Sequence, residues 1–154
     1  MATTIAAPHP HLPTLPRVRA ALPVMVVAGR ILFSAIFIVS SFSHFTAQGV
    51  GYATQMGVPL ARILVPASGL LALVGGLSVL LGYHARIGGL LLVAFLVPVT
   101  LWMHAFWTVK DPMMMAMQMA NFMKNVSMAG AALLIAYFGP GPWSIDERAR
   151  GEAD

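Results

Sequence analysis

The chain has 154 residues, of which 58% are hydrophobic and only 9% are charged, and its mean hydropathy is +0.81. Ordinary soluble domains carry about 25% charged residues, so this composition excludes a soluble globular protein and indicates an integral membrane protein. The net charge of +4 reflects few acids rather than many bases, and the bases are scattered, which argues against nucleic-acid binding. The lack of cysteine excludes disulfides, thiolate metal sites and thiol nucleophiles.

Four apolar stretches are each long enough to cross a bilayer, because a spanning helix needs about 20 residues. They predict an all-α fold, specifically an integral membrane four-helix bundle. Pro112 and the polar residues that follow weaken the start of the last stretch, so three spans plus a re-entrant segment is the alternative. The predicted spans are about Leu22 to Phe45, Arg62 to Tyr83, Ile87 to Trp107, and Met113 to the stop at Gly139-Pro140-Gly141-Pro142.

These spans divide the chain into three parts. Residues 1–21 are rich in proline and histidine and are predicted to be a disordered N-terminal tail. Residues 22–143 are predicted to form the four-helix domain, and residues 144–154 a cytoplasmic C-terminal tail. The connection from Thr46 to Pro59 has three glycines and no charge, so we expect a short surface or partly re-entrant segment.

The basic residues outside the spans predict the orientation in the membrane. With four spans, both termini lie on one side, together with the turn from Gly82 to Arg86. The side with more Lys and Arg faces the cytoplasm, so both termini are predicted to be cytoplasmic. That side has Arg17, Arg19, Arg86, Arg148 and Arg150, and the other has Arg62 and Lys110.

Small residues in the second span form a ridge. Ser68, Ala72 and Gly76 recur at every fourth position, so they share one helical face. Such a pattern lets a neighbouring membrane helix approach closely. We therefore expect a helix–helix contact along this face.

Two spans contain a basic residue with no acid near it. Arg30 is about eight residues into the first span and Lys124 about as far into the fourth, so both are predicted to approach the middle of the bilayer. Asp111, in a loop, is the only acid between them. Because a charge at the bilayer centre costs roughly 2.5 to 3.5 kcal/mol, we expect both side chains to face a protein interior or a wet cavity.

Other polar residues are predicted to gather around these charges. Asn121 and Asn125 lie on the same helical face as Lys124. His44 and His104 end the first and third spans, so they are predicted to meet near the outer edge of the membrane, with Trp107 close by.

Some group must satisfy the two cations in place of a carboxylate. Backbone carbonyls, side-chain amides, water and lipid phosphate are the structural alternatives, and they are favoured for any one residue. For the group as a whole we favour an electron-rich ligand from the bilayer, such as a quinone, whose carbonyl gains negative charge on reduction. No metal site and no catalytic residue is assigned. The candidate ligand-binding residues are Arg30, His44, His104, Trp107, Asn121, Lys124 and Asn125.

Short motifs occur along the chain in the order Arg30-Ile31-Leu32-Phe33, Gly57-Val58-Pro59, Gly75-Gly76, Leu81-Gly82, Met103-His104-Ala105-Phe106-Trp107, Lys124-Asn125 and Gly139-Pro140-Gly141-Pro142-Trp143-Ser144-Ile145-Asp146. Over about residues 25–146, this order and spacing resembles the DoxX family of small four-helix bacterial membrane proteins. The resemblance implies a bundle in the bacterial inner membrane.

Relatives in the DoxX family are linked to membrane oxidoreductase systems, including subunits of a thiosulfate:quinone oxidoreductase and a complex that handles thiol and oxidative stress. The resemblance matches Arg30, His104, Lys124 and Asn125 to the recurring polar positions of that family. No cofactor attachment sequence is present, so we expect no covalently bound cofactor.

Two functions are therefore considered. The first is a quinone-interacting or accessory subunit of a membrane redox system, with a soluble or membrane oxidoreductase as its partner. The second is a non-enzymatic membrane module that anchors a partner or moves a small solute. Whether the chain is an enzyme and whether it forms a homo-oligomer stay open.

Overall fold

The computed structural model describes residues 16–151, and side chains within residues 22–149. The described chain is helical and has no strand, which confirms the all-α prediction. Its α-helices are α1 (Pro16–Ser41), α2 (Ala47–Gln55), α3 (Ala61–Leu81), α4 (Ala85–Met103), α5 (Pro112–Phe138) and α6 (Ile145–Gly151), and two short 3-10 helices are η1 (Phe42–Phe45) and η2 (Phe106–Thr108).

Four helical segments are long and apolar enough to cross a membrane, which confirms an integral membrane four-helix bundle. Helix α1 begins at Pro16, ahead of the apolar segment that was predicted to start at Leu22. Residues 1–15, most of the predicted disordered tail, lie outside the described residues. The membrane segments are Leu22–Phe45, Ala61–Leu81, Ala85–Thr108 and Pro112–Phe138.

Local chemistry sets the two ends of α5. The side chain of Asp111 accepts a hydrogen bond from the N–H of Met114 at 2.8 Å, and Pro112 occupies the first turn, where a missing N–H costs nothing. Gly139 ends the helix with a φ of 86°, in a region that glycine reaches without steric cost. Pro112 therefore starts a continuous helix of 27 residues rather than breaking one, so no re-entrant segment forms here.

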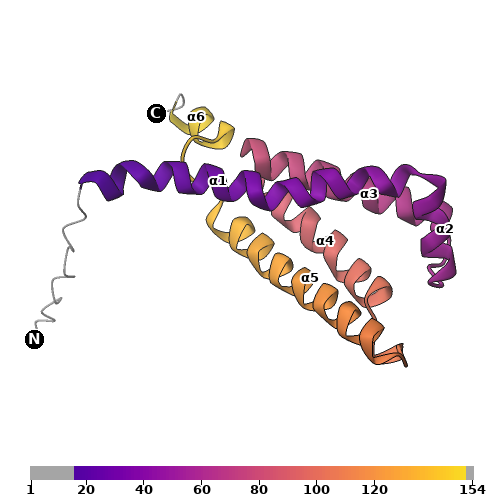
Figure 1. Cartoon of the computed structure of the whole chain (residues 1–154). Helices are drawn as coiled ribbons and strands as arrows, with labels where there is room; N and C mark the ends of the chain where they lie inside the picture. Colours follow the sequence, from indigo (N-terminus) through magenta and orange to yellow (C-terminus); the bar gives the residue numbers. More distant parts are fainter. Residues whose placement is uncertain (1–15, 152–154) are drawn as a thin grey trace, which may run out of the picture.

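The spanning helices pack in series, α1 on α3, α3 on α4 and α4 on α5 (Figure 1). The start of α1 and helix α6 lie at one end of the molecule, which we call the terminal end. Helix α2 lies at the opposite end, which we call the α2 end. Toward the α2 end, α4 and α5 diverge from α1 and α3 (Figure 1).

Glycines allow the close contacts between these helices. A Cβ on Gly76 of α3 would lie 3.0 Å from the side chain of Ile38 in α1, so the predicted ridge does receive a neighbouring helix. A Cβ on Gly75 would lie 3.0 Å from the carbonyl oxygen of Gly88 in α4. A Cβ on Gly89 would lie 2.7 Å from the carbonyl oxygen of Ala132 in α5. All three contacts lie in the half of the bundle toward the terminal end.

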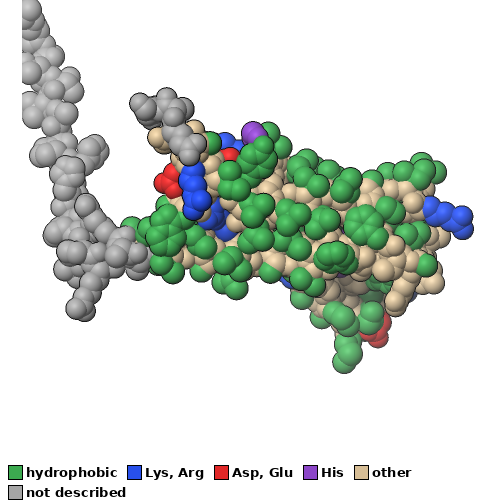
Figure 2. Space-filling view, turned by 90° about the horizontal axis from the view of Figure 1, so that it is seen from above, with side chains coloured by type: hydrophobic (Ala, Val, Ile, Leu, Met, Phe, Trp, Pro, Cys, Tyr) green, Lys and Arg blue, Asp and Glu red, His purple; other side chains and the backbone are tan. Residues whose placement is uncertain are grey.

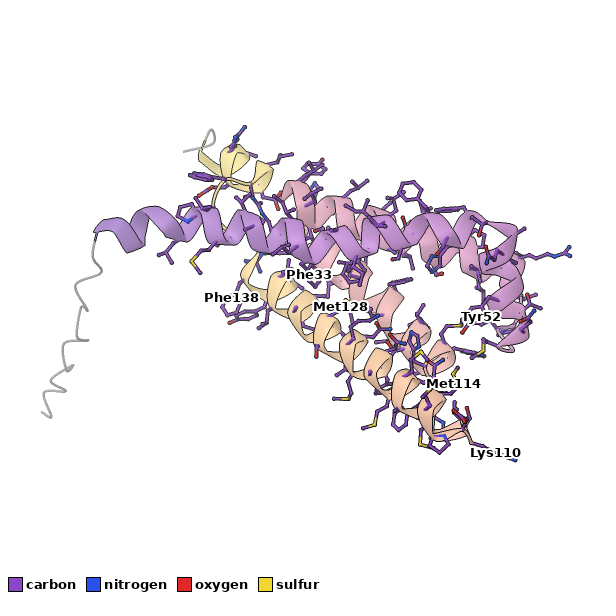
Figure 3. The ribbon with its side chains drawn as sticks, viewed as in Figure 1. Phe33, Tyr52, Lys110, Met114, Met128 and Phe138 are labelled. Atoms are coloured by element: carbon purple, nitrogen blue, oxygen red, sulfur yellow. The ribbon has the colours of Figure 1, made fainter. Side chains whose placement is uncertain are left out.

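A small core forms where the helices meet, while most large apolar side chains face outward. Figure 2 shows this apolar outer surface, which the lipid chains contact in a membrane. Phe33 of α1 and Met128 of α5 lie at the edge of the core, in the space between these two helices (Figure 3). The buried core residues are Phe37, Ala72, Val79, Leu92, Phe95, Leu96 and Ala132.

The connection from Thr46 to Pro59 is largely helical. Helix α2 begins after Thr46, whose side chain accepts a hydrogen bond from the N–H of Gly49 at 3.0 Å. Ala53 of α2 is buried against Ala61 and Val65 at the start of α3. The connection is therefore mostly a helix that packs on η1 and on the start of α3.

Replacing Gly89 by alanine is expected to force α4 and α5 apart. The new Cβ meets backbone rather than a movable side chain, so we expect a loss of about 1–3 kcal/mol in unfolding free energy. The matched control is Gly130→Ala in α5, where a Cβ meets nothing within 4 Å. Denaturation in mixed detergent micelles measures both variants, and equal stability of the two would contradict the close contact.

Candidate functional site

A cavity of about 450 Å³ lies at the α2 end, and we call it the α2-end cavity. Its walls come from η1, α2, the α2–α3 connection, α3 and α4. Most of the lining is hydrocarbon, from side chains such as Val65, Leu71 and Val99. The polar and aromatic lining residues are Ser43, His44, Tyr52, Ser68, Trp102 and His104.

Two histidines that the sequence predicted to meet, His44 and His104, both line this cavity. The Nδ1 atom of His44 lies 3.1 Å from the carbonyl oxygen of Ser40, and its ring packs edge-on against Phe95 at 5.7 Å between centroids. Gly69 makes room for this side chain, because a Cβ there would lie 2.6 Å from the Cβ of His44.

His104 terminates α4 and connects it to α5. Its Nδ1 atom lies 2.8 Å from Oε1 of Gln118, one of the few polar groups in the first half of α5. This hydrogen bond joins the end of α4 to α5 and orients the imidazole at the cavity wall.

The cavity opens on the lipid-facing surface of the bundle. Leu64, Ala67, Ala94 and Pro98 all line it, and all four are exposed on the outside of α3 and α4. These residues lie within the apolar membrane segments. The opening of the cavity therefore lies at the level of the apolar membrane segments.

Trp107 lies at a second, neighbouring hollow of about 340 Å³, which shares Trp102 and Met103 with the first. Its ring contacts Phe106 and Phe122 at 5.2 and 5.8 Å between centroids. Trp107 thus lies near the histidines, as predicted, but on the other side of the shared wall.

Arg30 lies far from this cavity, at the terminal end. Its side chain is 6% exposed, and its Nη2 atom donates to the carbonyl oxygen of Trp143 at 2.9 Å and, more weakly, to that of Pro142 at 3.4 Å. The guanidinium lies beside Gly82 in the α3–α4 turn. The C-terminal segment therefore folds back to meet Arg30 at the level of the α3–α4 turn, and the depth of Arg30 in the bilayer stays a prediction.

Lys124 is also directed away from the bundle interior. It is exposed on α5, and Nζ donates to Oδ1 of Asn121 at 3.1 Å, one turn earlier on the same helix. Asn125 is 6% exposed and faces the bundle. Adjacent positions on a helix are about 100° apart, so Lys124 faces outward while Asn125 faces the bundle. The prediction that they share one face is therefore wrong. The structure does not bring Arg30 and Lys124 together.

Several lining residues were missed by the sequence analysis. Ser43, Ser68, Tyr52 and Trp102 contribute to the cavity, and Gln118 holds His104. Tyr52 belongs to α2, at the α2 end of the molecule (Figure 3). Gln118 had a signal, since it is an amide within a run of methionines. The others are ordinary membrane-helix residues until the packing of α2 on α3 is known.

The C-terminal segment is anchored rather than a loose tail. Asp146 in α6 accepts hydrogen bonds from the N–H groups of His84 and Ala85 at 2.8 and 3.1 Å, which satisfies the start of α4. The guanidinium of Arg86 donates to the last carbonyls of α5, including that of Tyr137. These contacts hold the terminal end together.

The fold and its lipid-accessible cavity define the class, a small membrane protein with four spans. The family follows from comparison with known sequences, because the sequence model of the SURF4 family matches residues 3–151. The chain belongs to the SURF4 family.

Two relatives from Escherichia coli strain K12 support this membership. Inner membrane protein YphA is 30% identical over 131 residues, which cover 84% of this chain and 93% of the relative. Inner membrane protein YqjF is 33% identical over 123 residues, which cover 79% of this chain and 88% of the relative. No solved structure matches the chain.

The predicted membership of the DoxX family is therefore wrong. The motifs behind it include Gly75-Gly76 and Gly82, which form close helix contacts, and the stop after Phe138, which ends a span. Any tightly packed bundle of four short-looped spans needs small residues and stops at such places. The implied link to redox systems falls with that resemblance.

Removing the charge of Arg30 is expected to loosen the C-terminal segment. In a Ser144→Cys background, the probe position is 1% exposed and should react slowly with a maleimide. A charged hydrogen bond contributes about 1.5–3 kcal/mol, so Arg30→Gln should raise the labelling rate about tenfold or more. Arg62→Gln, which changes an exposed residue at the α2 end, is the control, and equal rates in both variants would argue against this anchor.

Proposed function

We propose that this protein is a non-enzymatic membrane module that binds a small bilayer-soluble molecule in the α2-end cavity. The observation that carries this proposal is the cavity of about 450 Å³ with its mouth at Ala67, Ala94 and Pro98. Ligand pockets commonly measure about 300–1,000 Å³ and combine an apolar lining with a few placed polar groups. The two histidines supply such groups.

Binding from the lipid phase suits the composition of the walls. An apolar body entering from the bilayer exchanges lipid contacts for contacts with Val65, Leu71 and Val99. Since lipid and protein are similarly apolar, the hydrophobic effect gives little preference for the bound state. Selectivity then has to come from shape and from hydrogen bonds at His44 and His104.

A quinone is one member of this class of ligand, and quinone binding stays a prediction. The argument from uncompensated cations no longer supports it, because Arg30 and Lys124 lie elsewhere. Neither does the family resemblance. The proposal therefore includes binding and no electron transfer. It shares the absence of catalysis with the second function considered from the sequence, but it replaces the anchoring of a partner or the movement of a solute by the binding of a bilayer-soluble molecule.

Filling the cavity should abolish binding. In a Trp107→Phe and Trp143→Phe background, the emission of Trp102 in the cavity wall reports on two probes, 4-octylphenol and a decyl-substituted benzoquinone. We expect saturable binding of at least one probe, weakened about tenfold or more by Ala94→Phe because the new ring occupies the cavity.

Two variants serve as controls for this test. Ala35→Phe adds the same ring on the exposed face of α1, and Lys124→Ala removes a side chain outside the cavity. Both should bind like the parent. Unsaturable signals for both probes, or equal weakening by Ala35→Phe and Ala94→Phe, would overturn the proposed site.

We further propose that both termini face the cytoplasm of a bacterial inner membrane, where the two relatives are named as residents. Arg86 and Arg148 lie at the terminal end, and Arg62 and Lys110 at the α2 end. On the positive-inside rule, Gly151→Cys should react with an impermeant maleimide only in inverted vesicles and Lys110→Cys only in intact spheroplasts. The chain has no native cysteine, so labelling is specific, and the reverse pattern would reject this orientation.

A further inference from the structure

Each histidine of the α2-end cavity forms a hydrogen bond within the protein through Nδ1. The Nδ1 partner of His44 is the carbonyl oxygen of Ser40, and that of His104 is Oε1 of Gln118. Both oxygens can only accept a hydrogen bond, so in each ring Nδ1 carries the proton. In a neutral imidazole the other nitrogen, Nε2, is then an acceptor. Neither Nε2 atom has a hydrogen-bond partner among the described residues.

The serines of the cavity wall also use their hydroxyl protons in hydrogen bonds within the protein. The hydroxyl of Ser43 donates to the carbonyl oxygen of Ser40 at 2.7 Å, and that of Ser68 donates to the carbonyl oxygen of Val65 at 2.8 Å. A serine hydroxyl has one proton and two lone pairs, so what remains on each oxygen is acceptor capacity. The indole N–H of Trp102 is also already bonded, because Nε1 donates to the carbonyl oxygen of Gly57 at 3.3 Å.

The backbone adds a further acceptor to the wall. Pro98 lies inside α4 and has no N–H, so it cannot donate to the carbonyl oxygen of Ala94 one turn earlier. Both residues line the cavity. The carbonyl of Ala94 is thus left without its usual helical donor, next to the mouth.

Tyr52 is the exception among the polar lining residues. Its hydroxyl has no hydrogen bond to another described residue, so it can donate or accept. The side chain is 51% exposed, and it belongs to α2 at the rim rather than to the apolar interior. The interior wall therefore presents acceptors, and the rim holds one group that can do either.

We infer that the ligand of the α2-end cavity is a hydrogen-bond donor, a bilayer-soluble molecule that carries a hydroxyl group. This inference rests on the proposed function and names the chemistry of its ligand. A hydroxyl that enters the cavity pairs with an acceptor that lacks a partner, such as Nε2 of His44 or His104. A molecule that offers only carbonyl or ether oxygens places acceptor against acceptor and loses its interactions with water or lipid headgroups without replacement. The cavity thus prefers phenols, quinols or glycerol-type alcohols to quinones.

The test compares 4-octylphenol with its methyl ether, 4-octylanisole, which keeps the ring and tail but has no proton to donate. Both are titrated into the purified protein carrying Trp107→Phe and Trp143→Phe, with Trp102 emission as the signal. We expect the phenol to bind at least about tenfold more tightly, since leaving a polar group unpaired costs about 1–3 kcal/mol.

The possible results separate the inference from the proposed function. Saturable binding of both probes with equal affinity, lost in Ala94→Phe, would overturn the donor requirement and leave the binding function intact. Binding of neither probe, nor of the benzoquinone, would overturn both. Tighter binding of the ether than of the phenol would show that the wall donates, and would also overturn the inference.

Two variants assign the preference to the wall. His44→Phe and Ser68→Ala each remove one acceptor with little change in shape, so they should weaken binding of octylphenol and leave octylanisole unchanged. Retained octylanisole binding also shows that each variant is folded. Unchanged octylphenol affinity in both variants would reject these acceptors.

Two kinds of membrane molecule share this chemistry, and separate arms distinguish them. A decyl-substituted benzoquinol represents ring hydroxyls, and 1,2-dioctanoylglycerol represents the hydroxyl of a glycerolipid. Each is titrated against the same protein with its methylated counterpart. The arm in which methylation lowers affinity identifies the source, and no effect of methylation in either arm would count against a hydroxyl ligand.

Discussion

The close approach of helix backbones through glycine is the constraint on which the rest of the structure depends. In a bilayer, apolar surface gains little by leaving lipid, so helices associate where their backbones can come near one another. Gly75 and Gly88 join α3 to α4, and Gly89 joins α4 to α5. These contacts lie in the half toward the terminal end. Beyond them, from Leu71 and Ala94 onward, the helices separate and the α2-end cavity opens between them.

The two ends of the bundle differ in what their polar groups contact. At the terminal end, Asp146 and Arg86 satisfy the free backbone groups of helix ends, and the buried guanidinium of Arg30 finds the carbonyl of Trp143. The guanidinium is not fully satisfied there, because its Nε and Nη1 atoms are buried without a hydrogen-bond partner among the described residues. At the α2 end, the polar side chains donate their protons to nearby carbonyl oxygens or to the amide oxygen of Gln118. Their remaining nitrogen and oxygen lone pairs can accept further hydrogen bonds. The two ends also differ in shape, since the α2 end holds a cavity of about 450 Å³ whose polar wall atoms can accept hydrogen bonds from another molecule.

The spans could be predicted from the sequence because a membrane helix is determined by its own residues. Length and hydropathy located Leu22–Phe45 and the later spans, and the positions of His44 and His104 at the ends of two spans indicated that they lie at the same end of the bundle. The partner of Arg30 could not be predicted in this way. The carbonyl oxygen that it contacts belongs to Trp143, 113 residues later in the chain, and no local pattern shows that the C-terminal segment folds back onto α1.

The sequence by itself determined that this is an all-α membrane protein with four spans, because every backbone polar group in lipid has to be satisfied within its own helix. It also determined where α5 begins, after Asp111, and where α3 and α5 end, at Gly82 and Gly139. Only the tertiary structure decided which polar residues act together, placing His44 and His104 at one cavity, Lys124 on the outside and Arg30 at the far end. The reason is that helical periodicity gives the face of a residue on its own helix, whereas contacts between distant segments decide what that face meets.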